Sequence, residues 1–357
     1  MATGTTAGEN CTNVRCLVVP RFNLLTLTAV IEPIRIANYL SPDALYQRHI
    51  HSLDGERVIA SNGISIDCTL PPERCDKDDI VFVFGSWGAE FYKNPKMLSW
   101  LRLQSRLGAR VCGVEIGSYL LARAGLLDGH IATTHWSYLS GFEEQFPDVE
   151  TVEQLYTIDR KLMTCAGGTG GIDLMLSLIS AEHGERLTAE ICDQMVHHVA
   201  RPADETQRAA LGHGIDSPLQ GVIDAVELID AHVSEPLKVP EIAKHVGLSQ
   251  RQLERQFHKA MGCSVVQFSL LTRLQRARVL LISTDLTVRE VSADCGFNSL
   301  SHFAYAFRKC FRKRPSDYRQ AWPEQETEPY WPGALGRYLD TSQVRRRIEE
   351  GTSRKPK

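Results

Sequence analysis

The chain has 357 residues, a length that suits two domains and a linker better than a single domain. Hydrophobic residues make up 43% of it and charged residues 23%, which is a globular composition and excludes a disordered or fibrous protein. The net charge of −3 conceals an asymmetry, because residues 1–216 carry nine more acidic than basic residues, whereas residues 217–320 carry five more basic than acidic ones. We therefore expect only the C-terminal part to meet a polyanion.

Residues 1–13 lack the basic start and apolar core of a signal peptide, and we expect them to be disordered. No stretch approaches the roughly 20 apolar residues that span a bilayer, so we expect no membrane association. The ten cysteines form no CxxC pattern and most lie in apolar runs, which predicts buried free thiols and no metal site. Without an export signal, the expected compartment is the cytoplasm.

Residues 14–200 alternate apolar runs with helical patterns: VRCLVVP, DIVFVFG, ARVCGV and KLMTCAGG each precede a helix-like segment. This alternation predicts a parallel sheet covered by helices on both faces. Ligands bind such folds at the carboxyl ends of the strands. The residues expected there are Phe22, Asn23, Gly85 to Trp87, Glu115, His135, Trp136 and Gly167 to Thr169.

Two glycine-containing segments in this region have different meanings. GGTGG at 167–171 does not match GxGxxG and no GK[ST] is present, so we expect no nucleotide cofactor and assign these glycines to close helix–strand packing. VCGVEIGSYLLARAGLLDG reads as a strand, a sharp turn at Glu115 and a helix, which is the layout of a nucleophile elbow.

Together with IATTHW and CAGGTGGIDLML, the elbow segment resembles the PfpI-type branch of the class I glutamine-amidotransferase-like fold, over about residues 14–200. The resemblance implies an α/β parallel-sheet sandwich with a cysteine nucleophile at the elbow, where this chain has Glu115. A carboxylate cannot perform thiolate chemistry, and Cys112, three residues earlier, is expected to be buried and inert within the strand. We therefore expect no catalytic residue and a domain that senses a ligand.

Glu115 would place negative charge at the ligand edge of the sheet, which favours a cation. Aromatic faces attract quaternary ammonium groups, and the candidates are Trp87, Trp136, Phe22 and Tyr119. The hypothesis is a cationic or zwitterionic amine as effector. The alternative is a structural Glu115, hydrogen-bonded or paired with an arginine such as Arg35.

Two further candidate pocket residues have equally plain structural alternatives. His135 either lines the pocket, as the family motif suggests, or packs in the core beside it. Glu32, in IEPIRIAN, either belongs to the pocket or forms a surface pair with Arg35.

Residues 201–216 mix proline, glycine and charges, as expected for a linker, and the region 217–320 reads as helical. A first helix begins with Ser217 as cap and Pro218 in its first turn. In VPEIAKHVGLSQRQLERQFHKAMG, the next helix ends at a turn at Gly247, and Ser249 caps a second helix whose inner face is Leu253 and Phe257. This is the layout of a helix-turn-helix unit.

The layout returns in LTVREVSADCGFNSLSHFAYAFRKCFRKRPSDYR, with its turn at Gly296. Val288, Val291 and Ala293 are expected on the inner face of its first helix, and Phe303 and Phe307 on that of its second. SVVQFSLLTRLQRARVLLIS reads as a long helix that joins the two units.

The second unit closely resembles the AraC/XylS family, over residues 217–320, and the two resemblances in this order indicate the GlxA-like group of that family. The resemblance implies a sequence-specific DNA-binding transcription regulator, most often an activator. It further implies a homodimer that binds double-stranded DNA and RNA polymerase, with effectors such as betaine, carnitine or other amino compounds.

By resemblance, Arg251, Glu254 and Arg255 fall where the family contacts bases, with Gln250 beside them; arginine suits guanine and glutamate suits cytosine. The matching positions of the second unit are Ser301, His302 and Tyr305, with Asn298 as helix cap. The basic residues expected on phosphates, or alternatively on a solvated face, are Lys259, Arg308, Lys309, Arg312 and Lys313.

Residues 321–357 contain scattered prolines and are expected to form a mobile tail, in which the run Arg345–Arg347 is a solvated charge cluster. Two alternatives to the sensor hypothesis stay open. One is a PfpI-type enzyme with hydrolase or lyase activity fused to a DNA-binding domain. The other is a DNA-binding protein whose N-terminal domain only dimerises.

Overall fold

The computed structural model describes residues 11–207, 220–311 and 313–321, which form two compact units divided between Gln207 and Arg208. The expectations for residues 1–10, for Ser217 and Pro218, for Arg312 and for residues 322–357 lie outside the described residues. No helix of the described part is long and apolar enough to cross a membrane.

The first unit is built on a six-stranded sheet with the order β2-β1-β5-β6-β10-β9. Every neighbouring pair is parallel except β10 and β9, which are antiparallel. The bounds of the strands are Thr12–Val18 for β1, Tyr46–His51 for β2, Ile80–Gly85 for β5, Arg110–Glu115 for β6, Tyr156–Asp159 for β9 and Leu162–Cys165 for β10.

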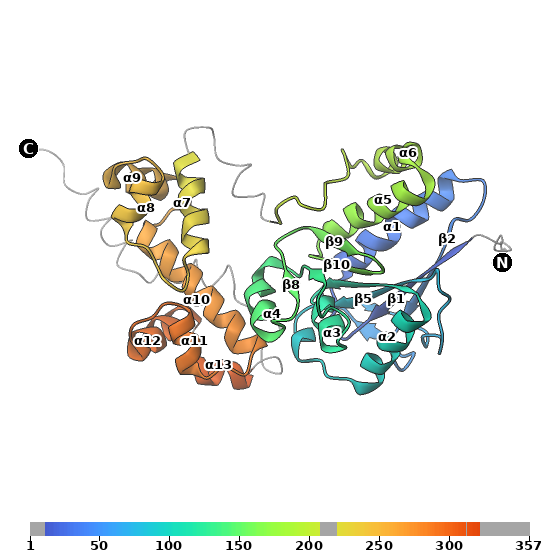
Figure 1. The fold of residues 1–357 in the computed structure, drawn as a ribbon, viewed down its shortest axis with the longest axis horizontal. Coiled ribbons are helices and arrows are strands. Elements are labelled where there is room, and N and C mark those ends of the chain that lie inside the picture. The colour runs from blue at the N-terminus through green and yellow to red at the C-terminus, as the bar shows by residue number, and fades with distance from the viewer. Residues whose placement is uncertain (1–10, 208–219, 312, 322–357) are drawn as a thin grey trace, which may run out of the picture. The chain divides into compact units, whose positions relative to one another are not determined.

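Helices cover both faces of this sheet (Figure 1). On one face α1 (Leu24–Leu40), α5 (Gly170–His183) and α6 (Glu185–Met195) pack against one another, and α2 (Pro95–Leu107) and α3 (Gly117–Arg123) pack together on the other. All six residues of β5 are buried, as expected for a parallel strand covered on both sides. The predicted α/β sandwich is therefore confirmed.

Short elements complete the first unit. They are β3 (Val58–Ile59), β4 (Ser65–Ile66), η1 (Ala89–Phe91), β7 (Ile131–Ala132), η2 (Trp136–Tyr138), α4 (Leu139–Gln145) and β8 (Glu150–Thr151).

The boundaries of the first unit differ from those expected. Strand β1 already begins at Thr12, inside the N-terminal segment that composition marked as disordered. At the other end, the unit continues to Gln207 rather than 200. Its last residues look like a linker in composition, yet they are fixed to the domain by hydrogen bonds, among them the one from the Arg201 backbone N–H to Asp173 Oδ1 (2.8 Å).

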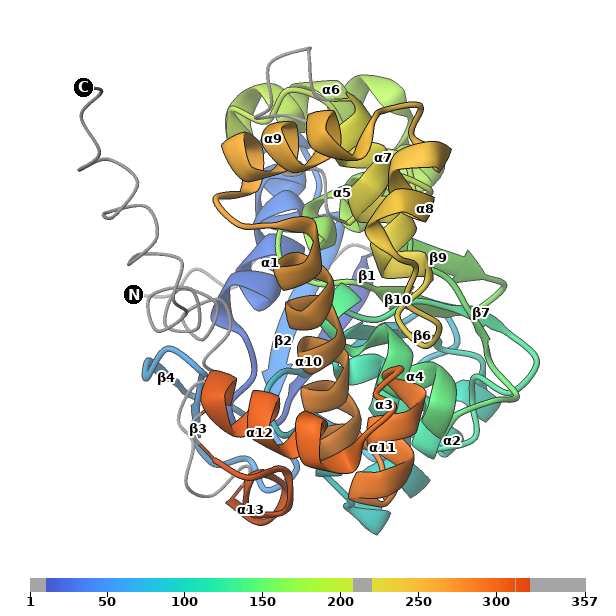
Figure 2. The same ribbon diagram turned by 90° about the vertical axis from the view of Figure 1, so that its left-hand side faces the viewer.

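The second unit consists of helices alone. Their bounds are Gln220–Ala231 for α7, Val239–His245 for α8, Gln250–Met261 for α9, Val265–Ser283 for α10, Val288–Asp294 for α11, Leu300–Phe311 for α12 and Pro315–Ala321 for α13. Figure 2 shows α10 running between the pair α8/α9 at one end and the pair α11/α12 at the other. The two predicted helix-turn-helix units and the long helix between them are confirmed.

Local details of these units follow the sequence with two exceptions. The Ser249 hydroxyl accepts the Gln252 N–H, and Leu253 and Phe257 are buried in a cluster with residues of α7, as predicted. In α11, however, Ser292 is buried and Ala293 is exposed. In α12 the hydroxyl that caps the first turn belongs to Ser299, which accepts the His302 N–H at 3.4 Å, so Asn298 is not the cap.

Candidate effector site and candidate DNA-binding surface

The turn after β6 is as sharp as the sequence predicts. Glu115 ends the strand with a φ of 58°, a left-handed conformation that few side chains adopt, and α3 starts two residues later at Gly117. A Cβ at Gly117 would lie 2.0 Å from the Val83 carbonyl oxygen, so only glycine fits there. The backbone thus holds Glu115 at the carboxyl edge of the sheet.

The Glu115 side chain is buried, with 7% of the residue exposed. Ser86, which follows β5, donates its hydroxyl to Glu115 Oε1 at 2.8 Å, whereas Oε2 is buried without a hydrogen-bond partner. Burial raises the pKa of Glu115 to about 7, although the side chains of Ser86 and Asn23 favour the charged form. A carboxyl group in this state would be stabilised in its charged form by a cationic partner.

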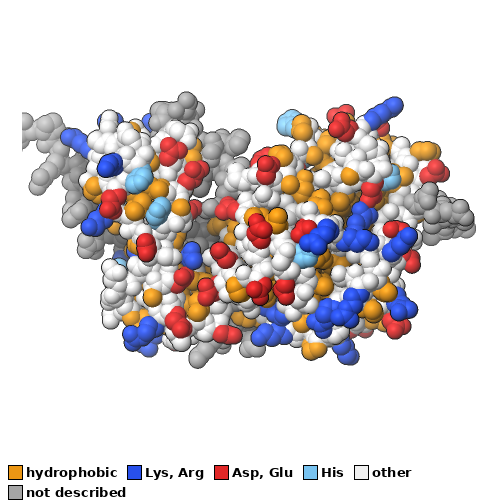
Figure 3. Space-filling view, in the orientation of Figure 1, with side chains coloured by type: hydrophobic (Ala, Val, Ile, Leu, Met, Phe, Trp, Pro, Cys, Tyr) orange, Lys and Arg blue, Asp and Glu red, His pale blue; other side chains and the backbone are white. Residues whose placement is uncertain are grey.

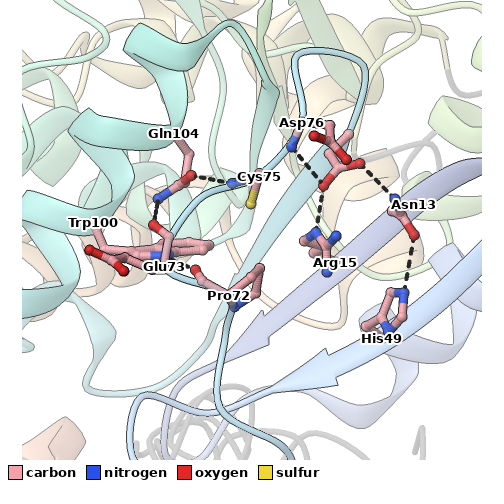
Figure 4. Close-up of polar contacts among 10 residues, drawn as sticks. Asn13, Arg15, His49, Pro72, Glu73, Cys75, Asp76, Trp100 and Gln104 are labelled. Carbon is pink, nitrogen blue, oxygen red and sulfur yellow. Dashed lines mark hydrogen bonds and ion pairs between the residues drawn. The ribbon is translucent and has the colours of Figure 1, made fainter.

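Two other buried carboxylates of the same unit already have cationic partners. Asp79 pairs with Arg15 of β1 at 2.6 Å and also accepts the Asn13 amide; Figure 4 shows Arg15 and Asn13 in this network, with His49 next to Asn13. Asp173 pairs with Arg201 at 2.7 Å. No ion pair among the described residues includes Glu115, which distinguishes it from both.

The surroundings of Glu115 are shaped by backbone as much as by side chains. Thr134 and Ser118 donate their hydroxyls to the Glu115 carbonyl oxygen at 2.8 Å and 3.0 Å. Gly167 faces the acidic side chain, because a Cβ built there would lie 2.8 Å from the Cβ of Glu115. A side chain at position 167 would therefore collide with the candidate site.

Trp87 and Trp136 are close in sequence to these contacts and are half-buried. Trp87 follows Ser86 directly, and Trp136 lies two residues after Thr134. His135, which lies between Thr134 and Trp136 in the sequence, accepts the Ser137 N–H at Nδ1. The proton of the neutral ring is therefore on Nε2. Burial lowers the pKa of His135 to about 4, so the ring is neutral and offers a donor rather than a positive charge.

The other sequence-predicted residues differ in their exposure. Phe22 is fully buried in the hydrophobic core and presents no ring face at the surface. Tyr119 is also fully buried and donates its hydroxyl to the Tyr138 carbonyl. Glu32 pairs with Arg35 at 2.7 Å on an exposed part of α1, which agrees with the surface-pair alternative and removes Arg35 as a partner for Glu115.

The glycine and cysteine expectations have mixed outcomes. Gly170 faces strand β10, since a Cβ there would lie 3.5 Å from Cys165 Sγ, as expected for helix–strand packing, whereas Gly171 packs against Ala29 and Val30 of α1. Cys112 is completely buried in β6, and burial raises the pKa of its thiol well above the ordinary value, which confirms the expectation of an inert thiol. All ten cysteines are free, and eight are buried.

A cavity of about 630 Å³ opens at the opposite, amino end of the strands. Its lining includes Asp79 and Glu182, but these carboxylates are already paired with Arg15 and Arg110. In the described residues no three His, Cys, Asp or Glu side chains gather in a metal-binding arrangement. The two paired carboxylates of this cavity therefore differ from Glu115, which has no ion pair among the described residues.

The outer face of α9 presents the residues expected on DNA. Gln250, Arg251, Arg255 and Lys259 are exposed, opposite the buried Leu253 and Phe257. Glu254 differs from them, because it is half-buried and its carboxylate accepts the Val265 N–H (3.5 Å) at the start of α10. His258 is exposed three residues after Arg255 and was missed, although helical spacing places it on the same face.

The outer face of α12 carries fewer charges. Ser301, His302, Tyr305 and Arg308 are exposed, with Tyr305 67% exposed, whereas Lys309 is half-buried and has an interaction partner within the protein. Asn298 is exposed just before the helix. Figure 3 shows both basic and acidic side chains on the drawn face of the first unit.

Comparisons with known proteins match both units. Residues 242–321 match the family "Helix-turn-helix domain", and residues 23–181 match the DJ-1/PfpI family. The HTH-type transcriptional regulator GbdR of Pseudomonas aeruginosa is 38% identical over 315 residues, which cover 88% of this chain and 86% of that protein.

Two further regulators are similar over most of their length. CdhR of Pseudomonas aeruginosa is 36% identical over 89% of this chain and 94% of its own, and GlxA of Rhizobium meliloti is 29% identical over 87% and 97%. These relatives are transcriptional regulators and not enzymes, as the glutamate at the elbow predicts for this chain. The chain therefore belongs to the AraC family of DNA-binding transcriptional regulators, in the group that joins an N-terminal DJ-1/PfpI domain to a C-terminal helix-turn-helix domain and includes GbdR, CdhR and GlxA.

Proposed function

We propose that the N-terminal unit binds a small cationic or zwitterionic amine at Glu115 and thereby controls DNA binding by the C-terminal unit. The observation that carries this proposal is Glu115 Oε2, which is buried without a hydrogen-bond partner. A bound cation would stabilise the charged carboxylate in a place where burial alone disfavours it.

The half-buried tryptophans favour a quaternary ammonium group, whereas a primary amine would instead donate an N–H to Glu115 Oε2. A quaternary ammonium group has no N–H to donate, so it depends on charge attraction and on contact with aromatic faces. Glu115 supplies the charge, and the half-buried Trp87 and Trp136 are the candidate aromatic partners. His135, neutral and with its proton on Nε2, is a candidate donor to the carboxylate of a zwitterion such as a betaine.

On the DNA side, we assign base contacts to the exposed α9 residues Arg251 and Arg255 and to Tyr305 and His302 of α12. The remaining expected contacts, including phosphate contacts, are assigned to Gln250, Lys259, Ser301, Arg308 and Lys309. Glu254 and Asn298 are assigned only minor contributions to DNA contact.

The regulator acts as an activator in the cytoplasm, as a homodimer that binds RNA polymerase, in keeping with the resemblance noted from sequence. Effector binding favours one conformational state, and that state differs from the other in its affinity for DNA.

Isothermal titration calorimetry of the full chain tests the effector class. The titrants are glycine betaine, carnitine, choline and 3,3-dimethylbutan-1-ol, which has the shape of choline without its charge. We expect binding of at least one of the charged compounds, no binding of the neutral alcohol, and loss of binding in Glu115→Gln. Glu32→Gln is the matched control, because it removes a carboxylate from the exposed surface of the same unit.

The outcomes separate the remaining alternatives. A charged ligand that binds Glu115→Gln as well as wild type would place the site elsewhere. If none of the charged compounds binds, the amine proposal is wrong and an N-terminal unit that only dimerises becomes the better interpretation.

A further inference from the structure

The last described residues of the first unit run along the edge of the sheet that carries Glu115. After α6, Arg201 binds Asp173 and donates to Thr169 Oγ1 (2.9 Å), both at the start of α5. Ala203 then accepts the Leu155 N–H at 3.0 Å. Leu155 precedes β9, whose first residue pairs with Cys165 at the carboxyl end of β10. The segment therefore follows the carboxyl edge.

Gln207 is the last described residue of this segment, and both the oxygen and the nitrogen of its side-chain amide form hydrogen bonds. Its Oε1 accepts the Trp136 N–H at 2.7 Å. Its Nε2 has three acceptors, the Gln154 carbonyl at 2.8 Å and the Thr134 carbonyl and Thr133 Oγ1 at 3.0 Å each. Glutamine offers both a donor and an acceptor with this reach, whereas asparagine is one carbon shorter and an ionised glutamate cannot donate.

Two of the residues that hold Gln207, Thr134 and Trp136, also belong to the surroundings of the candidate effector site. Thr134 accepts from Gln207 through its carbonyl and donates to the Glu115 carbonyl through its hydroxyl at 2.8 Å. Trp136 donates its backbone N–H to Gln207, and its ring is a candidate face for the ligand. Thr134 thus links Glu115 and Gln207 directly.

Gln207 is also the last residue before the division between the two compact units. From these contacts we infer that Gln207 is a positioning residue, a clasp that ties the connection to the DNA-binding unit to residues 133–136. This inference rests on the proposed function for the identity of the signal. A ligand that binds beside Glu115 and Trp136 displaces residues 133–136, weakens the clasp and thereby alters DNA binding by the second unit.

The Arg201 anchor serves as a structural contrast within the same segment. It binds Asp173 in α5 and Thr169, the residue before α5. Among the described residues it forms no hydrogen bond or ion pair with residues 133–136. The segment can therefore stay attached at Arg201 when the Gln207 clasp opens, so opening it requires a local rearrangement and no unfolding of the unit.

The first test measures the clasp without any ligand, by hydrogen–deuterium exchange of the full chain. In Gln207→Ala, the Trp136 amide loses its acceptor, and we expect exchange of the peptide that contains it to be at least about tenfold faster. Gln207→Glu is the second variant, because it keeps the acceptor but places a carboxylate against the Thr134 and Gln154 carbonyls. Asp204→Asn, an exposed position in the same segment, should leave exchange unchanged.

The second test measures the consequence for DNA binding, with a DNA site obtained by in vitro selection on the full wild-type chain. Without ligand, we expect Gln207→Ala to change Kd for this site at least about fivefold, and Asp204→Asn to leave it unchanged. With choline or glycine betaine present, the ratio of Kd values with and without ligand should approach one in Gln207→Ala, while calorimetric affinity for the ligand stays within about threefold of wild type.

The two proposals fail in different ways. If the wild type binds none of the amines, the proposed effector class is wrong, and the ligand-free exchange and DNA affinity still decide the clasp. If Gln207→Ala and Gln207→Glu both show wild-type exchange at Trp136 and wild-type DNA affinity, the clasp is overturned whatever ligand the protein binds.

Discussion

Glu115 lowers the stability of the ligand-free protein in a pH-dependent manner. Its pKa is raised from an ordinary value of 4.5 to about 7 in the folded state. Between these values the folded protein binds more protons than the unfolded chain, so stability falls as the pH rises through this range and the loss is complete above about pH 7. The loss amounts to about 3 kcal/mol for a fully buried group.

Replacing Glu115 by glutamine should therefore stabilise the protein, and more so at high pH. We expect the melting temperature of Glu115→Gln to exceed that of wild type clearly at pH 8, with the difference shrinking toward pH 5. Thermal unfolding across this range measures it. Glu32→Gln, which changes an exposed carboxylate, should give a small difference that does not vary in this way. A pH-independent gain in Glu115→Gln would show that Glu115 keeps an ordinary pKa.

Gly167 and Gly168 offer a matched pair for testing the space beside Glu115. Both have positive φ, so alanine costs about 1 kcal/mol of backbone strain at either position. A Cβ at Gly167 would also lie 2.8 Å from the Glu115 Cβ, whereas at Gly168 it would meet nothing within 4 Å. We expect Gly167→Ala to abolish amine binding and Gly168→Ala to retain it, by calorimetry. Equal affinity in the two variants would argue against a ligand beside Glu115.

At the scale of single residues, the sequence predicts where a turn lies along the chain better than it predicts how deeply a side chain is buried. The elbow pattern placed Glu115 correctly because spacing between a strand and a helix fixes the turn. Phe22 and Tyr119 were candidate aromatic faces, and the sequence did not indicate that both are fully buried, because burial depends on side chains from distant elements. Gln207 left no signal in the sequence, since its partners lie 53 to 74 positions away.

At the scale of elements, the two helix-turn-helix units depend on a close approach at Gly296. A Cβ there would lie 2.7 Å from the Ser234 carbonyl oxygen and 2.8 Å from that of Val233, in the connection between α7 and α8. Arg273 of α10 donates to the Gly296 carbonyl at 2.7 Å. The turn of the second helix-turn-helix unit is thereby packed against the first helix-turn-helix unit. This packing fixes the relative position of α9 and α12.

Gly247, the turn residue of the first unit, has the same φ of 69° but nothing within 4 Å of a Cβ. Gly247→Ala should therefore lower the free energy of unfolding by backbone strain alone, about 1 kcal/mol. Gly296→Ala should lower the free energy of unfolding by about 1–3 kcal/mol more than Gly247→Ala, because backbone atoms must move. It should also weaken DNA binding more than Gly247→Ala does. Thermal unfolding and DNA titration of both variants measure this. Similar DNA affinity in the two would mean that the spacing of α9 and α12 is set elsewhere.

Element type was predictable where periodicity is strong, as in the four strand–helix repeats and the two helix-turn-helix units. Strands β2 and β9 were not anticipated. The β2 sequence YQRHIH is polar and lies at the sheet edge, where alternation of buried and exposed residues is weak. Strand β9 has four residues and pairs antiparallel at the other edge, so the repeating pattern gives no indication of it.

At the scale of the whole molecule, charge and function are divided along the chain. The acidic excess lies in residues 1–216 and the basic excess in residues 217–320. A recognition helix enters one major groove, and two such helices joined by α10 suit successive grooves about 34 Å apart on one side of DNA. Net charge predicts which unit approaches DNA, but only side-chain geometry separates base contacts from phosphate contacts.

Arg255 and Lys259 are one turn apart and both exposed on α9, so variants of the two can distinguish a base contact from a phosphate contact. If Arg255 contacts a base, Arg255→Ala should lose about 1–3 kcal/mol of DNA-binding free energy, concentrated at one position of the site. If Lys259 contacts a phosphate, Lys259→Ala should weaken binding to all sequences alike and reduce the slope of log affinity against log salt by about 1. Titrations of each variant against a set of single-base substitutions, at several salt concentrations, measure both effects. A loss in Arg255→Ala that is uniform across the substitutions would reassign Arg255 to the phosphate backbone, and sequence discrimination would then rest on Arg251 and the residues of α12.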